Sequence, residues 1–238
     1  MECRMRFRID PAALERFPEL TIGVVMARGI DNREAGARAA ALLEEQVECV
    51  RETWSLERLD DDARIVAWRT AYRAFGAKPK KHRSSVENLI RMVINGVTVP
   101  SINTTVDVYN AISLKYAVPV GGDDLDRVAG DIRLTVATGE ERFIPLNSSD
   151  AVAPKPGEII YRDDEDVLCR RWNWRECDKS KMTEASTNLC LVVEGLPPFT
   201  ANDVGRIASE LVEAIEAFCG GRTAVHILDR NASKVECL

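Results

Sequence analysis

The order of its helical and strand patterns is the feature that most limits how this chain can fold. Apolar residues recur at three- and four-residue spacing through residues 35–54, 60–75 and 84–94, as on one buried face of a helix. From residue 131 onward, short strand-length runs are separated by turn residues such as Thr138-Gly139 and Asp163-Asp164. Because the connections between these segments are short, we expect a compact α+β fold.

These patterns predict individual elements. Helices are expected at residues 11–17, 32–54, 60–75 and 84–94, in the run that carries Asp107 and Asn110, and at residues 200–219. Strands are expected at residues 4–10, 20–28, 131–137, 141–146, 158–162, 167–175, 189–194 and 223–228. Ser84 and Glu87 have the spacing of a capping box, which marks the start of one helix, and Gly121-Gly122 is expected to lie in a turn.

Length and composition bear on domain organisation. With 238 residues, 45% of them hydrophobic, the chain can bury a large core, and we expect a single compact domain over residues 1–238. Within it, residues 1–83 are expected to form a strand and helix extension, and residues 84–238 the core. The apolar runs are short and broken by charges, and the start is not that of a signal peptide. We therefore expect a cytoplasmic protein with no membrane partner.

Cysteine and histidine usage argues against the familiar metal-binding and catalytic designs. The seven cysteines, at positions 3, 49, 169, 177, 190, 219 and 237, are odd in number and form no Cys-x-x-Cys pair, so we interpret them as reduced thiols. His82 and His226 have no cysteine or carboxylate at metal-ligand spacing, and no phosphate-binding loop or nucleophile elbow is present. We expect no bound metal and no cofactor.

The charge balance limits contact with nucleic acid to local sites. A net charge of -6 and a pI near 5.2 do not suit a protein that coats nucleic acid non-specifically. Two segments are locally basic and predict RNA contacts, the first through Lys78, Lys80, Lys81 and Arg83, the second through Arg170, Arg171 and Arg175. Trp172 and Trp174 interleave with the second set and could stack on bases. The alternative is a strand that turns its arginines outward and its tryptophans into the core.

Polar residues in the middle of the chain indicate a binding site. Asp107 and Asn110 are three residues apart, so they share one helix face, and Gly121-Gly122 follows at a point where the backbone could approach a ligand closely. Glu194 ends an apolar strand and is a candidate buried carboxylate. The alternatives are an Asp and an Asn that cap neighbouring backbone, and a glutamate that meets solvent at a strand end.

Residues 102–198 resemble a known family. The features that match are, in order, Val106-Asp107 with Asn110, Pro119, Asp124 with Asp126, Gly130-Asp131-Ile132-Arg133, Gly139-Glu140, Gly157-Glu158-Ile159-Ile160 with Asp163, and Thr187 before the strand that ends at Glu194. In this order they resemble the editing module of the phenylalanyl-tRNA synthetase beta subunit, formed by its paired third and fourth B domains. The resemblance implies mixed or antiparallel sheets packed with helices, preceded here by the helical N-terminal extension.

The resemblance also implies a function. A free-standing module of this kind would bind the 3′ aminoacyl end of tRNA and hydrolyse mischarged esters in trans, with tRNA and neither DNA nor a membrane as its partner. Asn110 and Glu194 match residues of the family's pocket and are the expected catalytic pair. The expected substrate-binding residues are Asp107, Tyr109, Gly121, Gly122, Asp124, Trp172, Asn173 and Trp174.

Three differences from the family leave a second function open. Tyr109 replaces a threonine, Gly121 stands where many bacterial members have a histidine, and residues 171–174 replace paired glycines. The retained Asn110 and Glu194 favour a deacylase, because positioned polar groups can supply much of the rate of ester hydrolysis. The differences favour a non-catalytic module that binds tRNA or an amino acid. A scaffold role is supported only by the long N-terminal helices.

Overall fold

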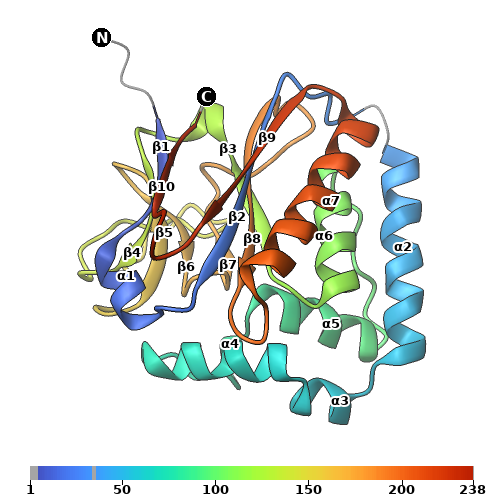
Figure 1. The fold of residues 1–238 in the computed structure, drawn as a ribbon, viewed down its shortest axis with the longest axis horizontal. Helices are drawn as coiled ribbons and strands as arrows, with labels where there is room; N and C mark the ends of the chain where they lie inside the picture. Colours follow the sequence, from blue (N-terminus) through green and yellow to red (C-terminus); the bar gives the residue numbers. More distant parts are fainter. Residues whose placement is uncertain (1–4, 34–35, 238) are drawn as a thin grey trace.

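The computed structural model describes residues 5–33 and 36–237, and in them the chain forms two sheets and a set of covering helices (Figure 1). The six-stranded sheet has the order β10-β1-β4-β5-β6-β7, with β1 at Arg6–Ile9, β4 at Ile132–Val136, β5 at Ile159–Arg162, β6 at Val167–Arg170, β7 at Arg175–Glu176 and β10 at Lys234–Glu236. The four-stranded sheet has the order β3-β8-β2-β9, with β3 at Val120–Asp124, β8 at Asn188–Gly195, β2 at Thr21–Arg28 and β9 at Arg222–Leu228. The pairing of β1 with β4 is parallel and the other strand pairings are antiparallel, so the predicted α+β class with mixed sheets is confirmed.

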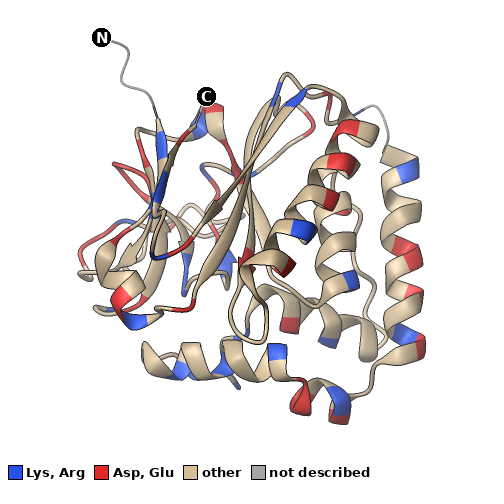
Figure 2. Cartoon of the chain, viewed as in Figure 1, with Lys and Arg blue, Asp and Glu red and all other residues tan. Residues whose placement is uncertain are grey.

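The longer helices cover one face of the four-stranded sheet and its lower edge, whereas α1 packs beside β4 of the six-stranded sheet (Figure 1). The helices are α1 at Pro11–Arg16, α2 at Gly36–Thr53, α3 at Leu56–Asp61, α4 at Ala63–Ala74, α5 at Ser85–Ile94, α6 at Thr104–Tyr116, a 3-10 turn at Leu125–Arg127 and α7 at Ala201–Cys219. Helix α7 packs on β2, β8 and β9, α6 packs beside it, and α2 lies outside α6. Acidic and basic side chains are interspersed on the outer helices α2 and α3, as expected of a solvated face (Figure 2).

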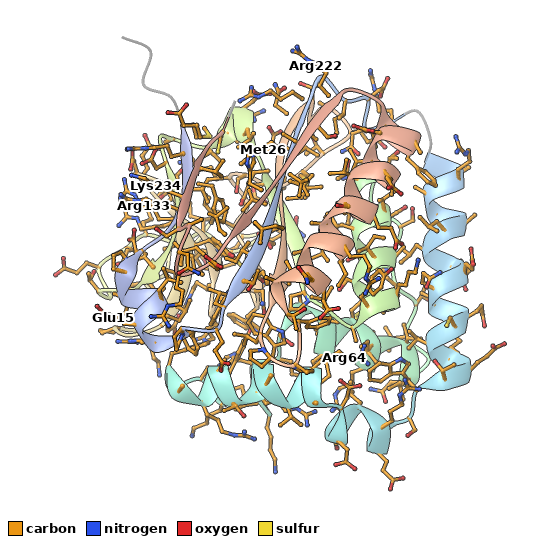
Figure 3. The ribbon with its side chains drawn as sticks, in the orientation of Figure 1. Glu15, Met26, Arg64, Arg133, Arg222 and Lys234 are labelled. Atoms are coloured by element: carbon orange, nitrogen blue, oxygen red, sulfur yellow. The ribbon has the colours of Figure 1, made fainter. Side chains whose placement is uncertain are left out.

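Strand β2 is buried on both faces, which explains why its apolar residues do not alternate with polar ones. Ile22, Val24 and Met26 face the core between the two sheets, whereas Val25 and Ala27 face the core under α6 and α7. Met26 therefore lies in the interior, whereas Glu15 and Arg222 are exposed (Figure 3). A strand buried on both faces needs apolar side chains at every position. Strands β1 and β2 precede residue 84, yet they lie inside the two sheets.

The predicted helices are largely confirmed. Helix α5 begins after Ser84, whose hydroxyl accepts a hydrogen bond from the Glu87 backbone N–H at 3.4 Å. The Glu87 carboxylate pairs with Arg69 at 2.8 Å. The single helix predicted at residues 60–75 is wrong: Asp62 is extended, with ψ of 123°, and its side chain accepts from the Arg64 N–H, so α3 ends there and α4 begins. The first strand's residue 4, Cys3 and the predicted helix positions 34 and 35 lie outside the described residues.

Several strand predictions need correction. The segment 141–146 forms only isolated bridges, β10 was not predicted, and the strand predicted at 167–175 is a hairpin of β6 and β7. In the hairpin, Arg171 and Trp172 have φ of 48° and 67°, a conformation that ends a strand. Gly121 and Gly122 lie inside β3 and not in a turn.

The two glycines of β3 differ in what surrounds them, which generates a stability prediction. A Cβ on Gly122 would lie 2.1 Å from the Cys190 carbonyl oxygen, whereas a Cβ on Gly121 would meet only the Glu176 carboxylate at 3.4 Å. We expect Gly122→Ala to lower the free energy of unfolding by about 1–3 kcal/mol or more, because β8 cannot move away without breaking its ladder. We expect Gly121→Ala to change it by less than about 1 kcal/mol. Urea unfolding of both variants measures the difference, and equal losses would contradict it.

Candidate functional site

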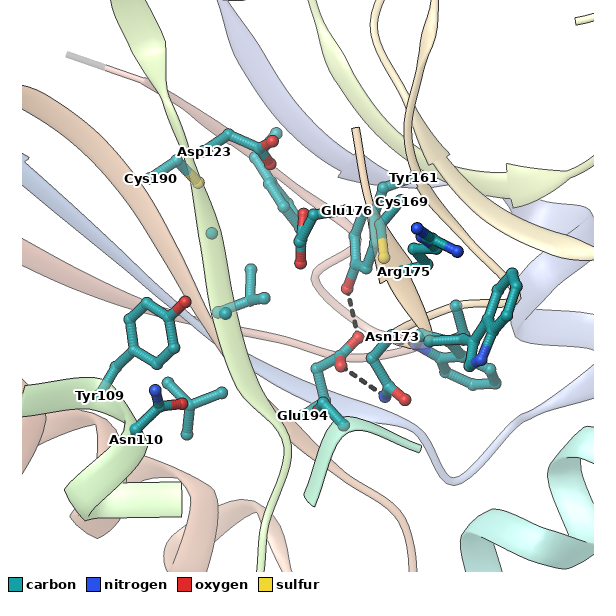
Figure 4. Close-up of a pocket in the computed structure, with 18 residues that line it drawn as sticks. Tyr109, Asn110, Asp123, Tyr161, Cys169, Asn173, Arg175, Glu176, Cys190 and Glu194 are labelled. Atoms are coloured by element: carbon teal, nitrogen blue, oxygen red, sulfur yellow. Dashed lines mark hydrogen bonds between the residues drawn. The ribbon is translucent and has the colours of Figure 1, made fainter. Parts of the chain in front are cut away.

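A cavity of about 150 Å³ lies where the two sheets and α6 meet (Figure 4). Strands β3 and β8 form one wall, the hairpin of β6 and β7 forms another together with β5, and α6 contributes Tyr109 and Asn110. The predicted site residues that line it are Tyr109, Asn110, Gly121, Gly122, Trp172, Asn173, Trp174, Arg175 and Glu194. The fold therefore brings the expected catalytic pair, Asn110 and Glu194, to one cavity from distant parts of the sequence.

Glu194 accepts three side-chain hydrogen bonds at this cavity. Its side chain is on β8, and the residue is 1% exposed. One carboxylate oxygen accepts from the Tyr161 hydroxyl at 2.6 Å and from the Trp172 indole N–H at 2.7 Å, and the other accepts from the Asn173 amide at 2.7 Å. Burial raises the pKa of Glu194 to about 7, although the three donors oppose that rise. The alternative of a strand-end glutamate in solvent is therefore wrong.

The N-terminal helices hold the partners of Glu194 in place. The Tyr72 hydroxyl, on α4, donates to the Asn173 side-chain oxygen at 2.8 Å, which turns the Asn173 amide nitrogen towards Glu194. The Trp172 ring packs edge-on against Phe17 and Trp68, with ring centroids 4.7 Å and 5.0 Å away. These contacts keep the 171–174 turn in its left-handed conformation and aim two donors at one carboxylate.

Two further carboxylates line the same cavity. Asp123, on β3, accepts a hydrogen bond from the Ser180 hydroxyl, and burial raises its pKa to about 7. Glu176, on β7, has a pKa well above its ordinary value because it is buried next to Asp123 and Glu194. Burial and these carboxylates also raise the pKa of Tyr109. The cavity is therefore rich in carboxyl groups that retain protons near neutral pH.

The cavity adjoins a second one of about 290 Å³ that carries positive charge. Asn110 and Trp174 line both cavities, and Lys81 and Arg83 line the second. His82, between these two cations, packs edge-on against the Trp174 ring at 4.7 Å. The basic segment predicted to contact RNA is thus next to the pocket, with Lys78 and Lys80 exposed on the same loop.

Other predicted site residues lie outside the cavity lining. Asp107 is fully buried and accepts from the Ser101 hydroxyl and, at 2.9 Å, from the Ile102 backbone N–H. Asp124 accepts from the Asp126 backbone N–H at 3.0 Å and from the Ser186 hydroxyl. These contacts agree with the alternative in which such residues cap neighbouring backbone, because each aspartate accepts a hydrogen bond from a backbone N–H close to it in the sequence.

The second basic segment is divided between the core and the surface. Arg170 and Arg171 are each 8% exposed and pair with Glu158 at 2.8 Å and 3.1 Å. Arg175 is exposed and lines the cavity, with its guanidinium 6.0 Å from the Trp174 ring centroid. Arg175 is therefore the member of this segment that is exposed beside the pocket.

Sequence reasoning missed Asp123, Tyr161, Cys169 and Glu176 as lining residues. Glu176 was hidden because a continuous strand at 167–175 does not return towards the pocket, whereas the hairpin does. Asp123 directly follows Gly122. A strand prediction for this segment, in place of the expected turn, would have indicated that Asp123 is a candidate for the pocket wall. The sequence signal for both is the register of a strand, and that register depends on tertiary pairing.

Neither metal sites nor membrane spans are found in the described parts of the chain. Over residues 5–33 and 36–237, no group of histidine, cysteine, aspartate and glutamate side chains is arranged to hold a metal ion. Within the same ranges, no helix has both the length and the apolar character needed to cross a bilayer.

Comparisons with known proteins agree with the resemblance seen in the sequence. Residues 67–216 match the family model of the B3/4 domain. The chain is 32% identical over 75 residues to the phenylalanine–tRNA ligase beta subunit of Fusobacterium nucleatum, and 34% identical over 77 residues to that of Mycoplasmoides gallisepticum. Each match covers 32% of this chain and 9% of the relative, so the match spans about a tenth of the length of these curated relatives.

A solved structure was also found. It is an N-terminal fragment of the phenylalanyl-tRNA synthetase beta subunit from Pyrococcus horikoshii, matched with a TM-score of 0.43 and 12% identity. The match covers 91% of this chain and 49% of that fragment.

The raised pKa of Glu194 predicts a pH-dependent stability. Its pKa rises from 4.5 to about 7 on folding, so the folded state binds the proton more tightly and loses stability as the pH rises through this window. Relative to Glu194→Gln, the wild-type free energy of unfolding should fall by about 3 kcal/mol between these pH values. The exposed Glu213→Gln is the control, and denaturant unfolding from pH 4 to 8 measures the difference. Parallel curves for wild type and Glu194→Gln would contradict the prediction.

Proposed function

This chain belongs to the B3/4 domain family, and we propose that it binds the 3′ end of tRNA and hydrolyses mischarged aminoacyl esters in trans. The observation that carries the proposal is the meeting of Asn110 and Glu194 in one small cavity that adjoins a basic one. The sequence resemblance to the phenylalanyl-tRNA synthetase beta subunit is confirmed by the family match and by the two curated relatives. The activity itself is our inference from that kinship and from the pocket.

The dimensions and charges of the two cavities suit the end of an aminoacyl-tRNA. The inner cavity, at about 150 Å³, is smaller than the roughly 300–1,000 Å³ of pockets that hold drug-sized ligands, so it suits an aminoacyl group. The outer cavity offers Lys81 and Arg83 to phosphates and the Trp174 ring to a base. If the acyl group binds in the inner cavity, the ester bond would lie beside Asn110 and Trp174, which line both cavities.

The proposed chemistry needs only positioned polar groups. Water attacks the ester carbonyl carbon, the bond from that carbon to the ribose oxygen breaks, and the amino acid and the free tRNA hydroxyl leave. The Asn110 amide, which has no hydrogen bond to a side chain or backbone group of the described residues, can orient the water. The Glu194 carboxylate can bind the α-ammonium of the substrate while its three donors hold it still.

The alternative is a module that binds the same ligand and does not hydrolyse it. The observation in its favour is that Glu194 is already bonded by three neutral donors, an arrangement that serves binding as well as catalysis. Gly121 also contributes no side chain to the pocket wall, where a histidine was expected. Under this alternative, tRNA or an aminoacyl group binds with the same contacts and the ester stays intact.

The proposal predicts the effect of removing either pocket residue. Asn110→Ala and Glu194→Ala should each slow single-turnover deacylation of a mischarged tRNA by about a hundredfold or more, since each removes a group that orients water or substrate. Asn95→Ala, an exposed asparagine at the end of α5, is the matched control and should leave the rate unchanged. The measurement is release of the labelled amino acid from a panel of correctly and wrongly charged tRNAs. Absence of release from every tRNA would refute hydrolysis and leave the binding alternative.

The basic outer cavity predicts a local electrostatic contribution to tRNA binding. Lys81→Ala should weaken tRNA binding and reduce the slope of log affinity against log salt concentration by about 1, because one phosphate contact is lost. Lys234→Ala removes an exposed lysine on β10, in the six-stranded sheet, and should change neither quantity. Filter binding at several salt concentrations measures both. The same slope in wild type and Lys81→Ala would rule out this contact.

A further inference from the structure

Glu176 is placed in the cavity by its strand. Its backbone oxygen accepts from the Leu146 N–H at 3.0 Å, and it pairs in register with Cys169 across β6 and β7. The carboxylate then lies against β3, where one oxygen is 3.4 Å from the position that a Cβ on Gly121 would occupy. The Glu176 carboxylate therefore lies inside the pocket, beside the backbone of β3 (Figure 4).

The carboxylates of this cavity have no cationic partner among the described residues. Arg175 lines the cavity, yet no ion pair joins Glu176, Asp123 or Glu194 to a lysine or arginine in residues 5–33 and 36–237. A contact with the Cys169 thiol, a weak donor, slightly opposes the raised pKa of Glu176. Glu194 has three neutral donors and Asp123 has one, so Glu176 is the least satisfied of the three.

Elsewhere in the same fold, buried carboxylates are often neutralised by a cation. Glu87 pairs with Arg69, Glu158 with Arg170, and Asp163 with Lys179, each at 2.8 Å. A buried carboxylate without a cation is costly, and it either keeps its proton or awaits a positive charge. The raised pKa of Glu176 has this cause. A ligand that brings a cation to Glu176 would neutralise its carboxylate, as the arginines and the lysine do at these three sites.

The position of Glu176 relative to the entrance decides which part of a substrate it meets. Asn110 and Trp174 line both cavities, whereas Glu176 and Asp123 line only the inner one. In Figure 4 these two carboxylates lie on the upper side of the pocket, whereas Asn110 and Glu194 lie on its lower side, apart from each other. With the ester beside Asn110 and the α-ammonium on Glu194, the side chain of the amino acid extends towards Glu176.

From this geometry we infer that Glu176 is a specificity-determining residue that selects aminoacyl groups whose side chain carries a positive charge. The substrate class is thus the ester of a basic amino acid of lysine, ornithine or arginine type. This inference rests on the proposed function, since it names the substrate of the same pocket. The Asp123 carboxyl lies beside Glu176, and a cation brought by the ligand would favour the ionised form of both groups.

The test uses non-hydrolysable 3′-amide analogues of aminoacyl-adenosine, in which binding is separated from turnover. The lysyl and norleucyl analogues share one carbon chain and differ by the side-chain ammonium. Titration calorimetry should show about tenfold to a hundredfold tighter binding of the lysyl analogue to the wild-type protein. Glu176→Gln should remove that preference and leave norleucyl binding intact, whereas the exposed Glu213→Gln should keep the preference.

Three results would overturn the inference. The first is equal affinity of the wild type for the lysyl and norleucyl analogues, and the second is a lysyl preference that survives in Glu176→Gln. The third is a preference for the tyrosyl over the phenylalanyl analogue that exceeds the lysyl preference and is removed by Glu176→Gln. The last would mean that a protonated Glu176 bonds a neutral hydroxyl.

Deacylation of lysyl-, arginyl-, tyrosyl- and phenylalanyl-tRNA separates the failure of this inference from that of the proposed function. Hydrolysis of the neutral esters alone, at a rate unaffected by Glu176→Gln, would support the proposed function and refute the selectivity. Selective binding of the lysyl analogue without any hydrolysis would support the selectivity and refute the deacylase.

Discussion

The hydrogen bonds to Glu194 join the two sheets at the centre of the molecule. Glu194 belongs to the four-stranded sheet, and its three donors, Tyr161, Trp172 and Asn173, belong to β5 and to the hairpin of the six-stranded sheet. Removing the carboxylate would leave buried donors without an acceptor, which costs about 1–3 kcal/mol for each group. The same interaction that aligns the sheets also shapes the cavity wall, so structure and site depend on one residue.

Support for this interaction comes from parts of the chain that the family resemblance of the sequence did not include. Helix α4 supplies Tyr72, which orients Asn173, and Trp68, which packs on Trp172 together with Phe17 from the turn after α1. Residues 67–216 match the family model, so its start lies just before these α4 residues. The N-terminal segment is therefore part of the architecture of the pocket and not only an attachment to it.

The ionisable groups of the site are arranged in two layers, with cations outside and carboxyl groups inside. Cations surround the outer cavity at Lys81 and Arg83, whereas the inner cavity holds Asp123, Glu176 and Glu194 without a paired cation among the described residues. An aminoacyl-tRNA has the complementary arrangement, with phosphates outside and an ammonium at its tip. Under the proposed function, this complementarity would let a chain with a net charge of -6 approach RNA at one place.

The sequence by itself determined the α+β class, most elements, the burial of β2 and the family, because these depend on local periodicity, caps and residue order. Two predictions made from the sequence were wrong for local reasons. Asp62 divides one predicted helix into two, and the backbone conformation of Arg171 and Trp172 turns a predicted strand into a hairpin.

Only the tertiary structure decided which polar groups share the cavity. The spacing of Asp107 and Asn110 in the sequence places both on one helix face. In the structure, Asp107 accepts a hydrogen bond from a backbone N–H, whereas Asn110 lines the pocket. Glu176 enters the site because the chain turns back as β7, which brings its carboxylate beside Gly121, 55 positions earlier in the chain. The physical reason is that strand register and close packing, and not local propensity, decide where a side chain is buried and what it meets.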